Sequence, residues 1–193
     1  MSRDGITAII PVRLGAPRKS RLSGVLSSIE RERLADQLFA HVTNIVSNHP
    51  DVAGTIVLSP VQPRSDDFSW RSDSGQGLNL ELEALRAELR ADDLLIVHAD
   101  LPLLTAEDVT AMIDAARLTG VAIAPDHLET GTNAVAVHKD RRFPFAFGSG
   151  SLAAHIAAAD VSSALVRRIG LALDIDRPED LVLAEREGFV RDR

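Results

Sequence analysis

The sequence predicts an α/β protein in three layers, with a mostly parallel central sheet. Short apolar runs rich in Ile and Val alternate with segments of about ten to twenty residues whose apolar side chains recur at helical spacing. This alternation indicates βαβ units, whose helices cover both faces of one sheet. The chain has 193 residues, of which 45% are hydrophobic and 25% charged, so we expect a single domain over residues 1–193 with a substantial core.

The first half of the chain begins with an expected buried strand. A helix should follow from Ser27, because Ser27 and Glu30 form a capping-box pair and apolar residues recur after them at helical spacing. The elements expected in this half are a strand at 5–12, the helix from 27, a strand at 52–58, a polar loop at 59–75 and a helix at 78–90. A loop as long as this one is either mobile or functional.

The second half continues the alternation. Thr105 with Asp108 marks another helix start, and Pro178 suits the first position of a last helix. We expect strands at 93–99, 121–124, 132–137 and within 164–172, and helices at 105–118, 151–159 and from 178. Because ligands of such sheets bind beyond the carboxyl ends of the strands, the segments that follow the strands are the expected site.

Composition and charge exclude several classes of function. With 21 Lys and Arg against 28 Asp and Glu, the net charge is −7, which disfavours nucleic-acid binding because phosphate backbones need a basic surface. Cysteine is absent, which excludes disulfides and cysteine-ligated metal sites. No apolar stretch approaches the roughly 18 residues of a membrane span, and no signal-peptide pattern is present, so we expect a cytoplasmic protein that does not associate with membranes.

Histidine patterning gives little support to metal or triad chemistry. The six histidines show no zinc-ligand spacing, and most are expected to be structural or surface residues. His155 is the exception, because it lies four residues after Ser151 and would share a helix face with it.

Positive charge gathers after the first strand. The cluster consists of Arg13, Arg18, Lys19 and Arg21, in an otherwise acidic chain. Its glycine and its cations would suit a triphosphate. The segment is not a P-loop, because that motif has Gly directly before its Lys and Ser, and Arg18 stands there. A solvated charged loop is the alternative.

Three aspartates are candidates for binding a hard cation such as Mg²⁺. Asp100 directly follows a buried strand and is held by the stiff turn at 101–103. Asp174 and Asp176 are two residues apart in an extended segment, so their side chains point to the same side and could join Asp100. The alternatives are that Asp100 only satisfies loop amides and that Asp176 is the N-cap of the last helix.

Two glycine-containing turns are candidates for binding an anion. The turns at 131–133 and 148–151 let backbone amides approach a ligand closely. Thr132 and Ser151 add hydroxyl donors. A carboxylate or phosphate could therefore be held there without full positive charge.

A series of short motifs covers nearly the whole chain in a specific order. They are Pro11-Val12, Lys19-Ser20-Arg21-Leu22, Ser28 with Glu30-Arg31, Gly77-Leu78-Asn79, Ala99-Asp100-Leu101-Pro102-Leu103-Leu104, Gly131-Thr132-Asn133-Ala134, Phe147-Gly148 with Gly150-Ser151 and His155, and Leu173-Asp174-Ile175-Asp176 with Pro178-Glu179-Asp180-Leu181. The series resembles the 2-phospho-L-lactate or phosphoenolpyruvate guanylyltransferases of coenzyme F-420 biosynthesis. This resemblance implies a Rossmann-like nucleotidyltransferase fold related to the GT-A sheet.

The resemblance also implies a role for each matching residue. Asp100, Asp174 and Asp176 would hold Mg²⁺ against the phosphates, and Asp100 would act in catalysis with Lys19 and Arg21, which steady the triphosphate. Thr132, Gly148 and Ser151 would contact the phosphorylated acid. Arg13, Lys19, Gly77 and Asn79 would bind the nucleotide, the last two near the guanosine.

The reaction implied by the resemblance is transfer of GMP from GTP to the phosphate of phosphoenolpyruvate or 2-phospho-L-lactate, with release of pyrophosphate. Its partners are GTP and a small phosphorylated carboxylic acid; a homodimer and hand-off of the product to a following transferase are compatible with it. Two alternatives remain, namely another acceptor such as 3-phosphoglycerate or a sugar phosphate, and a regulatory nucleotide-binding module without catalysis. The sequence departs from the family at Arg13, usually Lys, at Leu152, usually Phe, and at 59–61, which lacks the usual acidic residue.

Overall fold

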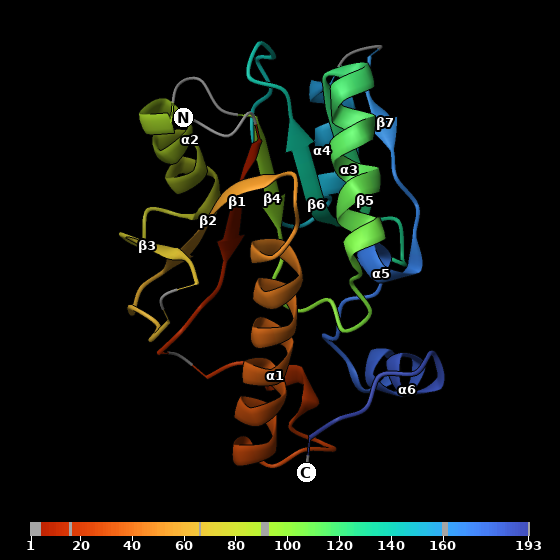
Figure 1. Ribbon diagram of the computed structural model, residues 1–193. Helices are drawn as coiled ribbons and strands as arrows, with labels where there is room; N and C mark the ends of the chain where they lie inside the picture. The colour runs from red at the N-terminus through yellow and green to blue at the C-terminus, as the bar shows by residue number, and fades with distance from the viewer. Residues whose placement is uncertain (1–4, 16, 66, 90–92, 160–161, 193) are drawn as a thin grey trace.

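A seven-stranded sheet organises the chain, with the strand order β3-β2-β1-β4-β6-β5-β7 (Figure 1). The structure is a computed structural model that describes residues 5–15, 17–65, 67–89, 93–159 and 162–192. The strands are β1 (Ile6–Pro11), β2 (Val52–Ser59), β3 (Ser69–Ser72), β4 (Leu94–Val97), β5 (Val121–Pro125), β6 (Thr132–Val137) and β7 (Ala164–Leu165). The α/β class and the mostly parallel sheet are confirmed.

Strand β6 is the exception to the parallel arrangement. It runs antiparallel to both β4 and β5, whereas β1 pairs in parallel with β2 and β4, and the outer pairs β2–β3 and β5–β7 are also parallel. The connection at 126–131 is too short for a parallel crossover, which needs a dozen or more residues. As a result, Thr132 at the start of β6 lies at the end of the sheet where β1, β2 and β4 have their carboxyl ends.

Two of the helices begin at the capping boxes that the sequence predicts. They are α1 (Ser28–Ser47), α2 (Leu78–Leu89), α3 (Ala106–Thr119), α4 (Ser151–Ala158), α5 (Ile169–Ala172) and α6 (Pro178–Arg186), with a 3-10 helix η1 (Ser20–Leu22). Ser27 and Glu30 form the expected capping box of α1, and Thr105 and Asp108 form that of α3. Such a cap contributes about 1 kcal/mol of stability. Arg90, the expected end of α2, lies outside the described residues.

Helices cover both faces of the sheet. One core cluster joins α1 and α3 to one face, through residues such as Val42, Val46 and Met112. A second joins α2 and α4 to the other face, through Leu82 and Leu152. The expected three layers are therefore present. Among the described residues, no helix combines the length and the apolar composition that crossing a membrane requires.

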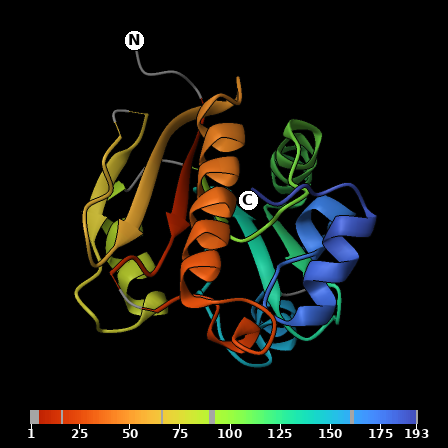
Figure 2. The same ribbon diagram turned by 90° about the horizontal axis from the view of Figure 1, so that it is seen from below.

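A third core cluster lies to one side of the sheet and joins η1, α1 and α6. Its members include Leu22, Leu34, Leu38, Leu173, Ile175 and Leu181. The C-terminal segment runs back along α1, where Gln37 Nε2 donates to the carbonyl oxygen of Val190 at 2.7 Å. Figure 2 shows α6 and this segment beside α1. The cluster thus anchors the chain on both sides of two site segments, 19–21 and 174–176.

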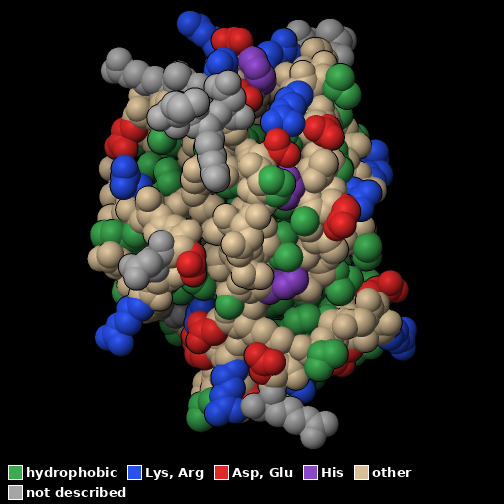
Figure 3. All heavy atoms as spheres, viewed as in Figure 1, with side chains coloured by type: hydrophobic (Ala, Val, Ile, Leu, Met, Phe, Trp, Pro, Cys, Tyr) green, Lys and Arg blue, Asp and Glu red, His purple; other side chains and the backbone are tan. Residues whose placement is uncertain are grey.

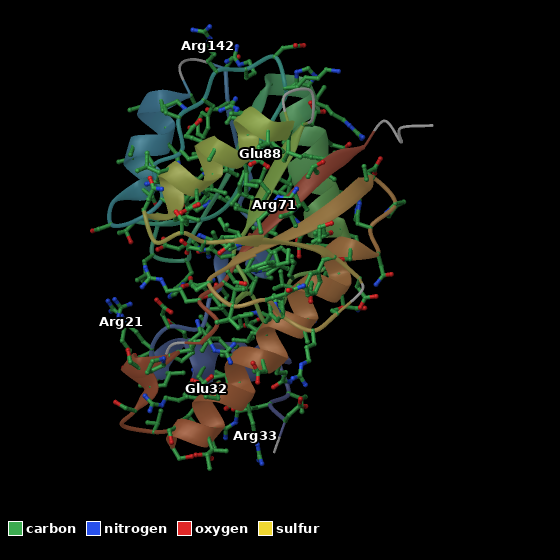
Figure 4. The ribbon with its side chains drawn as sticks, turned by 90° about the vertical axis from the view of Figure 1, so that its left-hand side faces the viewer. Arg21, Glu32, Arg33, Arg71, Glu88 and Arg142 are labelled. Carbon is green, nitrogen blue, oxygen red and sulfur yellow. The ribbon has the colours of Figure 1, made fainter. Side chains whose placement is uncertain are left out.

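Two expectations about secondary structure are wrong, those for the loop at 59–75 and for the N-cap of the last helix. The polar loop at 59–75 contains β3, an edge strand that pairs with β2 and is joined to α2 by the Arg71–Glu88 ion pair of 3.6 Å (Figure 4). The strand expected within 164–172 is confirmed as β7, which covers only Ala164–Leu165 and is followed by α5. The N-cap of α6 is Arg177 and not Asp176; the backbone N–H groups of both residues donate to Asp180 Oδ2.

Gly170 in α5 is packed so closely that a side chain has no room. A Cβ atom there would overlap the Asp108 carboxylate and lie 2.5 Å from the carbonyl oxygen of Leu103. Because this carbonyl belongs to the backbone, no rotamer change relieves the contact. We expect Gly170→Ala to lower the free energy of unfolding by about 1–3 kcal/mol, measured by urea denaturation. Gly54→Ala is the control, since its Cβ would meet no atom within 4 Å; equal losses in both variants would contradict this packing.

Candidate active site

A cavity of about 650 Å³ lies at the carboxyl ends of β1, β2 and β4. Its wall is formed by residues 11–13 and 17–19 after β1, Pro60 after β2, residues 73–75, 77 and 78 at the start of α2, residues 98–100 after β4, and Asp176. This volume suits a small-molecule ligand. The cavity lies where the rule for parallel sheets predicts a site.

The three candidate aspartates converge at these carboxyl ends of the strands. Asp100, Asp174 and Asp176 each place a carboxylate oxygen so that all three oxygens lie within 4.8 Å of one another. Leu173 and Ile175 are fully buried in the third core cluster. Because side chains alternate along an extended segment, burial of these two turns both aspartates the other way. The backbone N–H of Ile175 donates to the carbonyl oxygen of Asp100 at 3.2 Å, which ties the two segments together.

Asn133 holds one of these carboxylates in place. Its buried side-chain amide donates to Asp174 Oδ1 at 3.2 Å and to the carbonyl oxygens of Leu171 and Ala172 at 3.1 and 2.9 Å. The sequence pointed to Asn133 only as part of the turn at 131–133. Its contact with Asp174 depends on a residue 41 positions away, which no local pattern reveals.

Lys19 is directed into the carboxylate cluster by an unusual backbone conformation. Its φ of 53° and ψ of 39° are left-handed, the conformation from which η1 begins. The ammonium lies 2.7 Å from Asp100 Oδ2 and 3.3 Å from Asp176 Oδ1. Such a backbone is costly for a residue with a side chain and is found most often at functional sites.

Arg21 approaches the same cluster from solvent. Its guanidinium lies 3.0 Å from Asp176 Oδ2, and its side chain is 66% exposed. In Figure 4 it projects from the left-hand side of the lower half of the molecule. Arg21 therefore keeps its charge near the carboxylates while remaining free to move toward a ligand.

The proximity of these charges shifts the pKa values of Lys19, Asp100 and Asp174. Burial opposes the charged form of Lys19, but attraction to Asp100 and Asp176 outweighs it and raises the lysine pKa. Burial likewise opposes ionisation of Asp100, but attraction to Lys19 outweighs it and leaves the pKa of Asp100 lowered. Burial, followed by repulsion from Asp100, raises the pKa of Asp174 to about 6.

The carboxylate cluster fits a divalent cation. Asp100 Oδ1 is buried and accepts no hydrogen bond from the described residues. An unpaired, buried carboxylate oxygen is costly unless something else pairs with it. Three carboxylates are also the hard oxygen donors that Mg²⁺ prefers. The donor set and the orphaned oxygen are therefore both consistent with Mg²⁺.

The four cations of the basic cluster have different surroundings. Arg18 is bound to α1, where its guanidinium contacts Glu32 at 2.7 Å and Asp36 at 2.5 Å, so it fixes the loop that carries Lys19 to this helix. Arg13 is exposed and lines the cavity. Over the face shown in Figure 3, Lys and Arg side chains are interspersed with Asp and Glu.

Thr132, Gly148 and Ser151 lie outside the cavity wall. Thr132 begins β6, directly before the Asn133 that holds Asp174. Gly148 is exposed with a φ of 131°, and Ser151 is the buried first residue of α4, where its backbone N–H donates to the carbonyl oxygen of Gly148 at 3.2 Å. His155 Nδ1 lies 3.0 Å from Thr132 Oγ1, which links α4 to β6.

The two residues expected near the guanosine have different positions. Gly77 lines the cavity with a φ of 103°. The side chain of Asn79 is occupied by one backbone unit: it donates to the carbonyl oxygen of Phe147 at 3.0 Å and accepts from the N–H of Phe147 at 2.8 Å. Asn79 therefore joins α2 to the segment before Gly148.

His98 is a cavity residue that sequence reasoning missed. It lines the cavity, and its ring centroid lies 5.3 Å from that of Phe147. Burial lowers its pKa, so it is neutral at physiological pH. The sequence signal that could have found His98 is side-chain alternation. His98 stands two residues before Asp100 at the end of a buried strand, so both side chains are expected on the same side.

Comparison with known proteins agrees with this architecture. A Desulfovibrio desulfuricans G20 crystal structure described as a nucleotide-diphospho-sugar transferase is similar in fold, with a TM-score of 0.75 and 15% identity over 94% of this chain and 86% of that one. The expected nucleotidyltransferase fold is confirmed. Relatives in sequence are more informative about the reaction.

Three relatives have guanylyltransferase names. The phosphoenolpyruvate guanylyltransferase of Sphaerobacter thermophilus is 39% identical, over 90% of this chain and 89% of that protein. The 3-phospho-D-glycerate guanylyltransferase of Phenylobacterium zucineum is 32% identical, over 93% and 89%. The 2-phospho-L-lactate guanylyltransferase of Methanopyrus kandleri is 29% identical, over 90% and 88%. The model of the family "Guanylyl transferase CofC like" matches residues 6–185. The chain therefore belongs to the CofC-like guanylyl transferase family of nucleotidyltransferase enzymes.

Proposed function

We propose that this protein transfers GMP from GTP to the phosphate of phosphoenolpyruvate or 2-phospho-L-lactate, in coenzyme F-420 biosynthesis. The observation that carries the proposal is the convergence of three carboxylates with Lys19 at a cavity of nucleotide size. Membership of the guanylyl transferase family supports the donor, and the names of the relatives support the acceptor. Because GTP is an intracellular nucleotide, the proposed reaction places the protein in the cytoplasm.

The reaction requires charge neutralisation more than proton transfer. An oxygen of the acid's phosphate forms a bond to the α-phosphorus of GTP, the bond from that phosphorus to the oxygen of the β-phosphate breaks, and pyrophosphate leaves. A phosphate monoester has a second pKa of about 6, so its attacking oxygen is already deprotonated at neutral pH. No general base is needed. A neutral His98 in the cavity wall is consistent with this chemistry.

The residues of the site have separate roles in binding the phosphates, the cation and the acid. Lys19 and Arg21 bring positive charge to the phosphates, with Arg13 and Gly77 on the cavity side that would receive the nucleotide. Asp100, Asp174 and Asp176 would hold Mg²⁺. When bound, Mg²⁺ neutralises charge on the attacking and leaving oxygens. Thr132, Gly148 and Ser151 would contact the acid.

A second acceptor is supported by one specific observation. The Phenylobacterium zucineum relative, at 32% identity, has a name that specifies 3-phospho-D-glycerate. That acid also combines a carboxylate with a phosphate monoester, so the same turns could hold it. We therefore keep 3-phosphoglycerate as the alternative acceptor.

Pyrophosphate release tests the proposed function. Purified protein is incubated with Mg²⁺, GTP and one of three acids: phosphoenolpyruvate, 2-phospho-L-lactate or 3-phosphoglycerate. ATP and CTP serve as nucleotide controls. We expect release that requires GTP and phosphoenolpyruvate or 2-phospho-L-lactate. Release with 3-phosphoglycerate alone would establish the alternative acceptor, and no release with any acid would overturn the proposal.

The raised pKa of Asp174 predicts a pH-dependent affinity for Mg²⁺. Because burial and repulsion from Asp100 raise this pKa to about 6, protons compete with the cation for the carboxylate below that pH. Lowering the pH from 7.5 to 5 is expected to weaken Mg²⁺ binding about tenfold, measured by titration calorimetry. Asp174→Asn should bind Mg²⁺ more weakly at pH 7.5 and lose most of the pH dependence. The same affinity at both pH values in the unaltered protein would contradict a role for Asp174.

A further inference from the structure

The segment before Gly148 is held by side chains instead of by a neighbouring strand. Three consecutive backbone N–H groups donate to acceptors on α2 and α4: Phe145 to Glu83 Oε1 at 3.1 Å, Ala146 to His155 Nε2 at 2.9 Å, and Phe147 to Asn79 Oδ1 at 2.8 Å. Side-chain hydrogen bonds of this kind fix the path of the backbone that enters the turn at 148–151. Of the three acceptors, His155 also contacts a residue of the proposed acid site.

The contacts of His155 determine which of its ring nitrogens carries the proton. Nε2 accepts from the N–H of Ala146, so it has no proton of its own. A neutral imidazole then carries its proton on Nδ1, which lies 3.0 Å from Thr132 Oγ1 and donates to it. His155 is fully buried, with ring centroids 5.4 and 4.8 Å from those of Phe143 and Phe147. Burial lowers its pKa to about 4, so this neutral form persists at physiological pH.

This hydrogen bond sets the orientation of the Thr132 hydroxyl. Its oxygen accepts the Nδ1 proton of His155, so the hydroxyl's own proton must point to a different acceptor. Thr132 is adjacent to Asn133, which holds Asp174. Because side chains alternate along a strand, the buried Thr132 hydroxyl faces α4 and not the side of Asn133 and Asp174. Its proton is thus left to donate at the end of the sheet where the acid is proposed to bind.

We propose that His155 is a positioning residue for the phosphorylated acid: it orients the Thr132 hydroxyl as a donor to the acid and holds the backbone that leads into Gly148. This inference rests on the proposed function. His155 acts through Thr132 and residues 146–151, and it does not touch the nucleotide cavity. Its loss should therefore affect use of the acid and leave use of GTP unchanged.

Two substitutions separate the two contacts of His155. In His155→Asn, the side-chain amide can still donate to Thr132 from the position of Nδ1. In His155→Gln, the carbonyl oxygen can still accept from Ala146 at the position of Nε2, but the donor to Thr132 is lost. We expect His155→Gln to raise the KM for the acid about tenfold with the KM for GTP unchanged, and His155→Asn to raise it less. His138→Gln, at the opposite end of β6, is the matched control and should leave both KM values unchanged.

A double-mutant cycle tests whether His155 acts through Thr132. Thr132→Val removes the hydroxyl, so adding His155→Gln to it should raise the KM for the acid by much less than in the parent protein. Additive effects, or an unchanged KM for the acid in Thr132→Val and His155→Gln, would overturn this inference. Circular dichroism and the unfolding midpoint of each variant show whether it is folded. An unaltered protein that releases no pyrophosphate with any acid would overturn the proposed function as well, whereas an active one with additive variants overturns this inference alone.

Discussion

Asp100→Asn is expected to reduce turnover at least about 100-fold while the protein remains folded. The substitution removes a carboxylate whose lowered pKa keeps it ionised and whose Oδ1 lacks a partner among the described residues. Both properties suit a cation ligand. The fold should persist because Lys19 keeps Asp176 at 3.3 Å, and Leu101 and the strand before it stay buried.

Pyrophosphate release at saturating GTP and acid measures this effect, and calorimetry measures Mg²⁺ binding by the same variant. Asp114→Asn is the matched control, because Asp114 lies on the exposed surface of α3 and pairs only loosely with Arg117 at 3.5 Å. We expect the control to retain full turnover and Mg²⁺ affinity. Near-normal turnover of Asp100→Asn would contradict the assignment of the carboxylate cluster as the cation site.

Lys19→Met is expected to lower kcat/KM for GTP by at least about 100-fold. Lys19 is the buried cation of the cluster, and attraction to two carboxylates keeps it charged. Arg21 cannot replace it, because its guanidinium contacts Asp176 from the solvent side. Without the ammonium, Asp100 and Asp176 are also left without their shared partner, so repulsion between them should reduce the stability of the metal-free protein.

Mg²⁺ gives Lys19→Met a second, independent readout. In the unaltered protein the ammonium already neutralises the carboxylates, whereas in the variant only a bound cation does so. Mg²⁺ should therefore raise the unfolding midpoint of Lys19→Met more than that of the unaltered protein. Lys139→Met, which changes the only other lysine of the sequence, is the control. Unchanged kcat/KM for GTP in Lys19→Met would remove Lys19 from the proposed reaction.

Patterns among residues that are close in the sequence explain which parts of the fold and the site the sequence alone predicts. Capping boxes at Ser27 and Thr105 depend on residues three positions apart, and both are formed. Continuous apolar runs identify β1, β2 and β4 because a buried parallel strand is apolar on both faces. Asp100 is recognised because it directly follows a buried strand, and Asp174 and Asp176 because residues two apart in an extended segment point to the same side. These features require only short-range patterns.

The tertiary structure decided which distant groups meet. A hydrogen bond joins Asn133 to Asp174, and others join Asn79 to Phe147 and His155 to both Thr132 and Ala146. The partner of a polar side chain is selected by proximity in three dimensions, which no local spacing encodes. The edge strand β3 is likewise stabilised by pairing with β2 and by the Arg71–Glu88 contact, and its own polar sequence does not reveal it. The sequence by itself thus determined the chemistry at the strand ends, and packing determined how those groups are held.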